Sequence, residues 1–298
     1  MQPNEVKALI HLIDDPDDAI FHQVREKIIS YGTDVIPHLE AYWGEGDFGL
    51  VFQERVENII NEIQFKGAKD SLTLWAESGG EKLIEGAILL AKYQYPDFDE
   101  KPMLLELEKI QKDIWIELNY NLTSFEKVKV FNHILFNIHG FTGNKTNFHA
   151  PQNCYINDVI QTKKGNPLSL CIIYIHLAQN LNVPIYGINL PSHFVLGYMD
   201  ELSILDNSNG KDQVLFYINA FSRGSIFYRQ EIDSFLRQMK VQKHEAFYNP
   251  CSNVDIILRQ IKNLIYSYNK LGYEEKVKEL STLHDAILPF STIKDLGN

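Results

Sequence analysis

The feature that most constrains the fold is a segment between residues 167 and 181 that is apolar on nearly every face. Its centre reads LSLCIIYIHLA. Asn166 suits the N-cap position before it, and Pro167 suits the first helical position, where no backbone donor is required. A helix without a polar face has to be buried in a larger core. The segment therefore predicts a central, buried helix over residues 167–181.

Three short runs after this helix read as strands, at residues 185–190, 193–199 and 214–221. Residues 206–212, DNSNGKD, form a dense turn signal between the last two runs, which predicts that they pair antiparallel. Pairing centred near this turn sets His193 opposite residues 219–225, so Asn219 is expected within reach of His193. A further helix is expected over residues 229–239. The sequence thus predicts an α+β domain in which a buried helix packs on a small antiparallel sheet.

The flanks of this region read as helices. Before residue 137, helical periodicity breaks at Gly32 and near Lys66-Gly67, a repeat-length apart, which fits either HEAT-like paired helices or an ordinary helical bundle. After residue 240, two helices over 254–269 and 274–287 meet at Leu271-Gly272 as a TPR-like hairpin. We therefore expect a helical region at 1–136, a central core at 137–240 and a helical hairpin at 241–298.

Charge and composition narrow the class of partner. The 298 residues carry 28 basic and 39 acidic side chains, a net charge of −11, so no basic surplus favours nucleic acid or an anionic membrane. The first 18 residues lack the basic start and apolar run of a signal peptide, and no apolar stretch reaches about 20 residues. Three cysteines are too few for a disulfide scaffold. A soluble, cytoplasmic protein is expected.

The order of helix, His strand and Asn strand has a known chemical use. A thiol at a helix N-terminus is activated by the helix dipole, an imidazole on a strand takes its proton, and an amide or carboxylate orients the imidazole. His193 and Asn219 are available for the last two roles. The first helical position, however, is Pro167, which has no nucleophile, and the nearest sulfur, Cys171, lies one turn deeper on the same helix face.

The residues that carry this order resemble the transglutaminase-like superfamily in its bacterial SirB-type branch. The resemblance covers residues 137–240 and rests on the Gly-Asn-Pro helix start at 165–167, the Leu-Pro-Ser-His-Phe stretch at 190–194 and the Tyr-Ile-Asn-Ala-Phe stretch at 217–221. It implies a papain/transglutaminase-like fold for the central domain. The helical flanks also fit the layout of that branch.

The resemblance assigns roles residue by residue. It aligns Pro167 with the catalytic cysteine of the superfamily, His193 with its histidine and Asn219 with its aspartate. Proline at the cysteine position is usual for the branch, whereas Asn219 and Ser192 replace its aspartate and glycine. An asparagine is compatible with chemistry, but a helix start without sulfur is not compatible with acyl transfer through a cysteine.

The cleft expected around these residues has a second contributor upstream. Asn153, Tyr155 and Asn157 match the branch's polar segment before the helix, and their expected role is to brace the cleft loop through side-chain to backbone hydrogen bonds. Cys154 lies in the same segment. The expected cleft residues are therefore Asn153, Cys154, Tyr155, Asn157, Pro167 and Ser192.

Three functions remain open from the sequence. The first is a pseudoenzyme that binds a peptide or protein partner in the cleft. The second is a cysteine hydrolase or acyltransferase that uses a displaced Cys171 or Cys154 with His193 as base and Asn219 as orienting group, although Cys171 also fits a packed core thiol. The third is a structural scaffold. His133, His139 and His149 are spaced too irregularly to predict a metal site, and no phosphate loop or cofactor motif is present.

Overall fold

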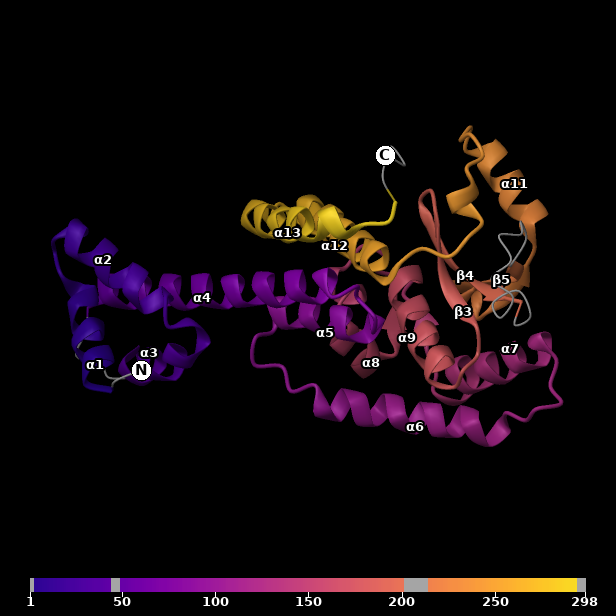
Figure 1. Ribbon diagram of the computed structural model, residues 1–298, viewed down its shortest axis with the longest axis horizontal. Coiled ribbons are helices and arrows are strands. Elements are labelled where there is room, and N and C mark those ends of the chain that lie inside the picture. Colours follow the sequence, from indigo (N-terminus) through magenta and orange to yellow (C-terminus); the bar gives the residue numbers. More distant parts are fainter. Residues whose placement is uncertain (1–2, 44–48, 201–213, 294–298) are drawn as a thin grey trace. The chain divides into compact units, whose positions relative to one another are not determined.

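The computed structural model describes residues 3–43, 49–200 and 214–293, and Figure 1 shows the order of the elements. The chain forms two compact units, residues 1–71 and 72–298. The boundaries expected at 136/137 and 240/241 both fall inside the second unit. The turn signal at 206–212 lies outside the described residues. In the three described ranges, no helix has both the length and the apolarity to cross a membrane.

The first unit is all helical. It contains α1 (Pro3–His11), α2 (Asp18–Ile29), α3 (Ile36–Trp43) and the first part of α4 (Leu50–Glu77). Asp17 caps α2 by accepting a 2.8 Å hydrogen bond from the backbone N–H of Ala19. The apolar stripes of these helices share one core, whose fully buried members include Ile10, Ile28, Leu39, Phe52 and Ile59.

The expected break near Gly67 is wrong, because α4 continues through it to Glu77. A single glycine inside a helix costs only about 1 kcal/mol relative to alanine. Buried side chains on both sides of Gly67, such as Ile63 and Leu72, offset that cost. The prediction of HEAT-like paired helices in the N-terminal region depended on this break, so the continuous α4 removes the observation that supported it.

The second unit combines helices with a small sheet, as the sequence predicts. Its helices are α5 (Leu83–Gln94), α6 (Lys101–Glu117), α7 (Ser124–Asn132), α8 (Ile156–Thr162), α9 (Pro167–Asn180), α11 (Arg229–Gln238), α12 (Asn253–Leu271) and α13 (Glu274–Ile287). Its strands are β1 (Thr142–Gly143), β2 (Lys164–Gly165), β3 (Ile185–Leu190), β4 (His193–Met199), β5 (Val214–Asn219) and β6 (Ser225–Phe227). Strands β1 and β2 form a short parallel pair, and the other four form an antiparallel sheet in the order β3-β4-β5-β6.

Both faces of the four-stranded sheet are covered. The central helix α9 packs on one face and α11 packs on the other (Figure 1). Phe194 and Leu196 belong to the α9 side, where a side chain at Gly187 would collide with Phe194 and with Ile256 of α12. Val195 belongs to the α11 side, where it packs with Leu236 and other apolar residues. Successive residues of β4 thus alternate between two cores.

The C-terminal helices α12 and α13 form the expected helical hairpin. Gly272 ends α12 with a φ of 78°, a left-handed conformation that suits glycine. Asp255, buried in the first turn of α12, accepts 2.5 Å hydrogen bonds from the hydroxyls of Ser291 and Thr292. These bonds fasten the residues after α13 to the start of α12.

Candidate functional site

The N-terminus of α9 is built as the sequence predicts. Asn166 is the N-cap, and its Oδ1 accepts a 2.8 Å hydrogen bond from the backbone N–H of Ser169. The hydroxyl of Ser169 accepts in return from the backbone N–H of Asn166 at 3.0 Å. This reciprocal capping box fixes the chain direction at the helix start, and Pro167 occupies the first helical position.

A cavity of about 390 Å³ opens at this helix start. Four parts of the second unit line it: the loop before α8, the start of α9, the turn between β3 and β4, and one face of α12. The lining residues are Phe148, His149, Cys154, Asn166, Pro167, Leu168, Ser192, Phe194, Arg259, Asn263, Tyr266 and Ser267. We call this space the α9 cavity. It occupies the place in the fold where the resemblance puts the catalytic cysteine.

Of the residues expected in the cleft, Cys154, Pro167 and Ser192 line the α9 cavity. Ser192 has a φ of 56°, in the left-handed region. It follows Pro191 in the two-residue turn between Leu190 and His193, so the turn needs a positive φ at its second position, where glycine is preferred. Glycine would adopt this conformation without the steric cost that a serine side chain carries.

The side chain of His193 lies outside the α9 cavity. Phe194, the next residue of β4, faces α9 and lines the cavity, so the alternation of the strand turns His193 to the α11 face. There its ring packs edge-on against Phe235 of α11, with 4.7 Å between ring centres. The imidazole of His193 therefore lies on the α11 side of the sheet, whereas Pro167 lies on the α9 side.

Asn219 ends β5 and is the N-cap of the short 3-10 helix that follows, Ala220–Ser222. Its Oδ1 accepts a 3.2 Å hydrogen bond from the backbone N–H of Ser222. The pairing of Leu196 with Ile218, extended by one residue, puts Asn219 across from Val195, two positions from His193 on the same face. Among the described residues, no hydrogen bond joins Asn219 to the His193 ring. The two are neighbours on the α11 face without forming an imidazole–amide pair.

The two cysteines considered as nucleophiles, Cys171 and Cys154, are both buried. Cys171 has no exposed surface, burial raises the pKa of its thiol, and its Sγ lies 3.9 Å from the carbonyl oxygen of Phe194. Cys154 is 2% exposed, and burial raises its pKa to about 12. The amide of Asn166 donates to the Cys154 Sγ at 3.1 Å. At neutral pH both thiols are protonated, and a thiol attacks only as its thiolate.

The other upstream residues point away from the α9 cavity into the structure. Asn153 donates to the carbonyl oxygens of Asn147 at 2.7 Å and Phe148 at 3.1 Å, which holds the loop at the mouth of the cavity. The Tyr155 hydroxyl lies 3.2 Å from the Tyr268 hydroxyl inside the core. Asn157 donates to Asp158 at 3.2 Å, and its buried Oδ1 has no hydrogen-bond partner.

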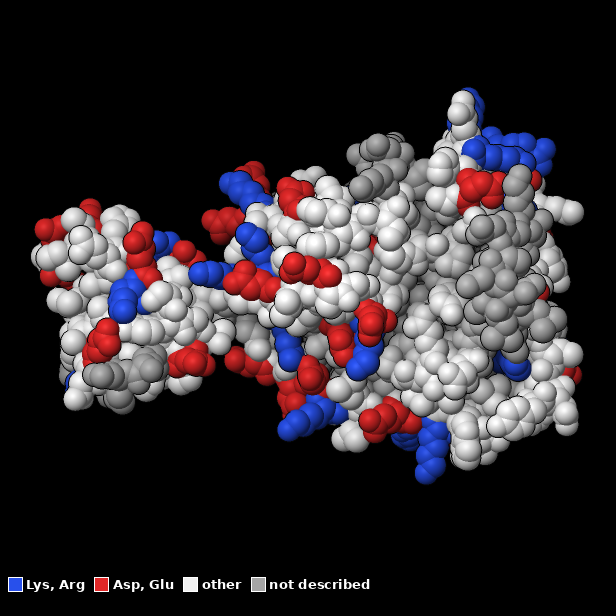
Figure 2. Space-filling model, in the orientation of Figure 1, with Lys and Arg blue, Asp and Glu red and all other residues white. Residues whose placement is uncertain are grey.

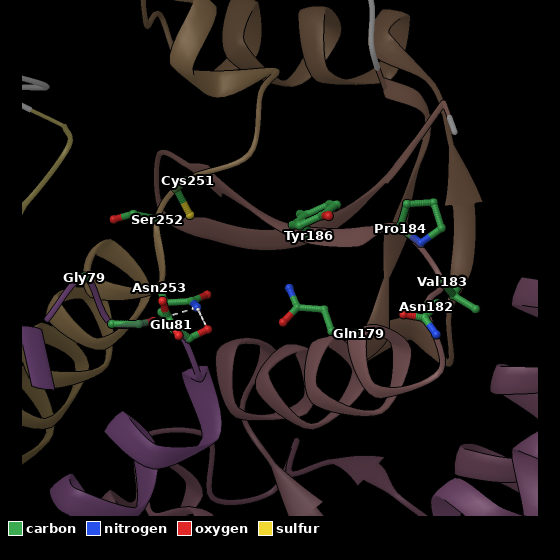
Figure 3. A pocket seen from close by; sticks show the side chains of 11 residues that line it. Gly79, Glu81, Gln179, Asn182, Val183, Pro184, Tyr186, Cys251, Ser252 and Asn253 are labelled. Carbon is green, nitrogen blue, oxygen red and sulfur yellow. Dashed lines mark hydrogen bonds between the residues drawn. The ribbon is translucent and has the colours of Figure 1, made fainter. Parts of the chain in front are cut away.

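A larger cavity, of about 870 Å³, lies at the other end of α9 (Figure 3). Gln179 lines it from α9, Asn182 from the loop after α9, Tyr186 from β3, and Cys251 from the segment before α12. Asn253 lines the cavity next to Glu81 (Figure 3), and it donates to the backbone carbonyl groups of Gly80 at 2.9 Å and Glu81 at 3.0 Å. None of the described residues that line this cavity is Lys or Arg, and the cavity lies at the opposite end of α9 from Pro167. We therefore take the α9 cavity as the candidate site.

The residues that α12 contributes to the α9 cavity were not predicted from the sequence. Arg259, Asn263 and Tyr266 reach the α9 cavity from positions spaced by four and three residues, that is, from one face of the helix. The sequence did contain one indication. Arg259 stands in the apolar run VDIILRQI, and a cationic side chain is rarely buried in a helix unless it has a partner or a function. Across the described ranges, no three His, Cys, Asp or Glu side chains gather as metal ligands.

Comparisons with known proteins agree with this fold. The chain is 31% identical to a UPF0162 protein of Xylella fastidiosa over 130 residues, which is 43% of this chain and 46% of the relative. It is 26% identical to a UPF0162 protein of Vibrio cholerae over 155 residues, 52% of this chain and 53% of the relative. The human protein named F-box only protein 21 is 24% identical over 192 residues, 63% of this chain but only 27% of the relative.

The chain thus spans about half the length of the bacterial relatives it matches. No solved structure matches it. The model of the transglutaminase-like superfamily matches residues 101–262, more than half of the chain, and this range contains Cys154, α9, the sheet and Arg259. The chain belongs to the transglutaminase-like superfamily.

Proposed function

We propose that this protein is a catalytically degenerate member of the superfamily that binds a peptide or protein segment in the α9 cavity. The observation that carries the proposal is Pro167 at the first position of α9, which the resemblance aligns with the catalytic cysteine of the superfamily. A proline ring cannot attack a carbonyl carbon, yet the helix start and the cavity beside it are fully built. On this proposal, the cavity at the start of α9 binds a ligand without a reactive sulfur at position 167.

The lining of the α9 cavity suits a peptide. Phe148 and Tyr266 are about half exposed at the cavity, so aromatic surface is available for apolar side chains. Asn263 and Ser192 add hydrogen-bonding groups between these aromatic surfaces. The cavity thus combines apolar surface with placed polar groups, and such a combination is usual in specific binding sites.

Charge argues for a protein partner over nucleic acid. The chain has a net charge of −11. On the face shown in Figure 2, the coloured Lys and Arg side chains alternate with Asp and Glu and form no continuous basic surface among the residues described. A phosphate backbone needs such a surface for its affinity.

The alternative is a cysteine hydrolase or acyltransferase with a displaced nucleophile. One observation favours it: Cys154 lines the α9 cavity beside Pro167. Against it stand the raised pKa of Cys154 and the position of His193 on the other face of the sheet. Cys171 is less suited still, because it is sealed beneath β4.

Two measurements test the proposal. Peptide hydrolysis and acyl transfer are assayed with the wild type, Cys154→Ala, Cys171→Ala and His193→Ala, and we expect no turnover from any of them. Turnover in the wild type that one of these substitutions abolishes would overturn the binding-only reading.

Binding is tested with a phage-displayed random dodecapeptide library, followed by calorimetry of the enriched peptides. Asn263→Trp fills the α9 cavity, and Lys262→Trp, at an exposed position one residue away on α12, is the matched control. We expect enriched peptides to lose affinity for Asn263→Trp and to keep it for Lys262→Trp. Equal affinity for both variants would show that the peptide binds elsewhere, and a library without enrichment would contradict the proposal.

A further inference from the structure

The α9 cavity contains a guanidinium without a counter-charge. Nη1 of Arg259 donates to Oδ1 of Asn189 at 2.8 Å and to the carbonyl oxygen of Leu190 at 3.1 Å. Both acceptors are neutral. No described carboxylate lies within ion-pair distance of Arg259, and no Asp or Glu lines the cavity. The positive charge is therefore held in the site without being neutralised.

One edge of this guanidinium is available to a ligand. Its two contacts to β3 both use Nη1, whereas Nη2 and Nε make no hydrogen bond to any described residue. Nη2 and Nε together form the planar fork that binds both oxygens of a carboxylate. Because β3 already holds Nη1, the fork is oriented before a ligand arrives, and less side-chain entropy is lost on binding.

The surroundings increase the attraction for an anion. Arg259 is mostly buried, and burial lowers the pKa of its guanidinium, although the group stays charged at neutral pH. A charge withdrawn from water interacts more strongly with an opposite charge than an exposed one does. The N-terminal end of α9, the positive end of its dipole, opens into the same cavity at Asn166 and Pro167.

We propose that the occupant of the α9 cavity carries a carboxylate, from an acidic side chain or a C-terminus, that pairs with the free fork of Arg259. This inference rests on the proposed function and specifies its ligand class. A single guanidinium matches the one charge of a carboxylate, whereas a phosphate group carries close to two. The aromatic rings of Phe148 and Tyr266 are placed for the apolar part of the same ligand.

The test uses four small probes that separate charge from shape. N-acetylphenylalanine carries a terminal carboxylate, and its amide is the uncharged match. N-acetylglutamate amide carries a side-chain carboxylate, and phenyl phosphate carries a phosphate. Binding is followed through amide chemical shifts in two-dimensional NMR spectra, with Ser192 and Asn263 as reporters because both line the cavity.

Each probe is titrated into the wild type and three variants. Arg259→Gln removes the charge, Arg259→Lys keeps the charge and removes the fork, and Lys262→Gln removes an exposed charge from the same helix as a control. We expect at least one carboxylate probe to bind the wild type and Lys262→Gln about tenfold or more tightly than Arg259→Gln, with Arg259→Lys in between. Whether N-acetylphenylalanine or N-acetylglutamate amide binds better identifies the source of the carboxylate.

Three outcomes would overturn the inference. If the amide binds as well as the acid, or if Arg259→Gln keeps the affinity for the acid, the carboxylate is not recognised, while peptide binding in the cavity survives. Stronger binding of phenyl phosphate would replace the carboxylate by a phosphate ligand. Chemical shifts of the variants report whether each one folds, and the Arg259→Lys comparison stands if Arg259→Gln does not.

Discussion

Replacing Pro167 by Cys would place a thiol at the first position of α9, and its reactivity can be compared with that of the native cysteines. The side chain at 167 lines the α9 cavity and is partly exposed. A thiol there has a pKa no higher than the ordinary value of about 8.5, because the helix dipole favours the thiolate. Cys154, which lines the same cavity, has a pKa raised to about 12 by burial.

The difference in reactivity follows from these two values. At pH 7 about 3 in 100 ordinary thiols are ionised, against about 1 in 100,000 at a pKa of 12, a ratio of about 3,000. The greater nucleophilicity of the more basic thiolate recovers a factor of about 40. Cys154 should therefore be alkylated about 80-fold more slowly than the new thiol, before its 2% exposure slows the reagent further.

Iodoacetamide labelling at pH 7, followed by mass spectrometry of each cysteine peptide, measures these rates. Asn263→Cys, which puts a thiol in the same cavity away from the helix start, controls for access of the reagent. Labelling in urea controls for peptide recovery. We also expect no acyl transfer from Pro167→Cys, since the imidazole of His193 packs on Phe235. Native labelling of Cys154 or Cys171 within a few-fold of the new thiol, or turnover by Pro167→Cys, would refute the reasoning.

Three further predictions concern stability. Ser192→Gly relieves a left-handed residue and should raise the free energy of unfolding by about 1 kcal/mol, measured by urea denaturation; a decrease would contradict the strain argument. Asp255→Ala leaves the hydroxyls of Ser291 and Thr292 without their acceptor and should cost about 2–3 kcal/mol in the same assay, so an unchanged midpoint would count against it. Burial lowers the pKa of His176 below its usual 6.5, so the unfolded chain binds its proton first as pH falls. Relative to His176→Gln, the protein should then lose stability below about pH 6.5, by at most about 1.4 kcal/mol per pH unit until the folded-state pKa is reached, and parallel pH profiles for the two proteins would exclude this.

Local signals were enough to predict the core of the fold. The cap at Asn166 and the proline after it predicted the start of α9, and the strand-like runs predicted β3 and β4 with the bounds observed. These signals act within a few residues, so the sequence shows them directly. The short helix α8 was not predicted, because its seven residues, INDVIQT, complete fewer than two full turns of a periodic pattern.

The residues that line the candidate site were harder to predict from the sequence, and the main cause is the pattern of β4. The strand reads HFVLGYM, and α9 and α11 bury both faces of its sheet, so apolar and polar residues do not alternate along it. Without alternation, nothing in the sequence says whether His193 or Phe194 faces α9. The lining from α12 comes from a segment about 90 residues after α9 starts, and only the tertiary fold brings Arg259 to Pro167.

The tight turn of Pro191 and Ser192 therefore has a consequence beyond its own strain. Because the side-chain repeat of a strand is two residues, shortening or lengthening this turn by one residue would exchange Phe194 and His193 between the two sides of the sheet. The length of this two-residue turn thus determines whether the phenyl ring of Phe194 or the imidazole of His193 lies beside Pro167. A single inserted residue there would therefore turn His193 toward the side of the sheet on which Pro167 lies.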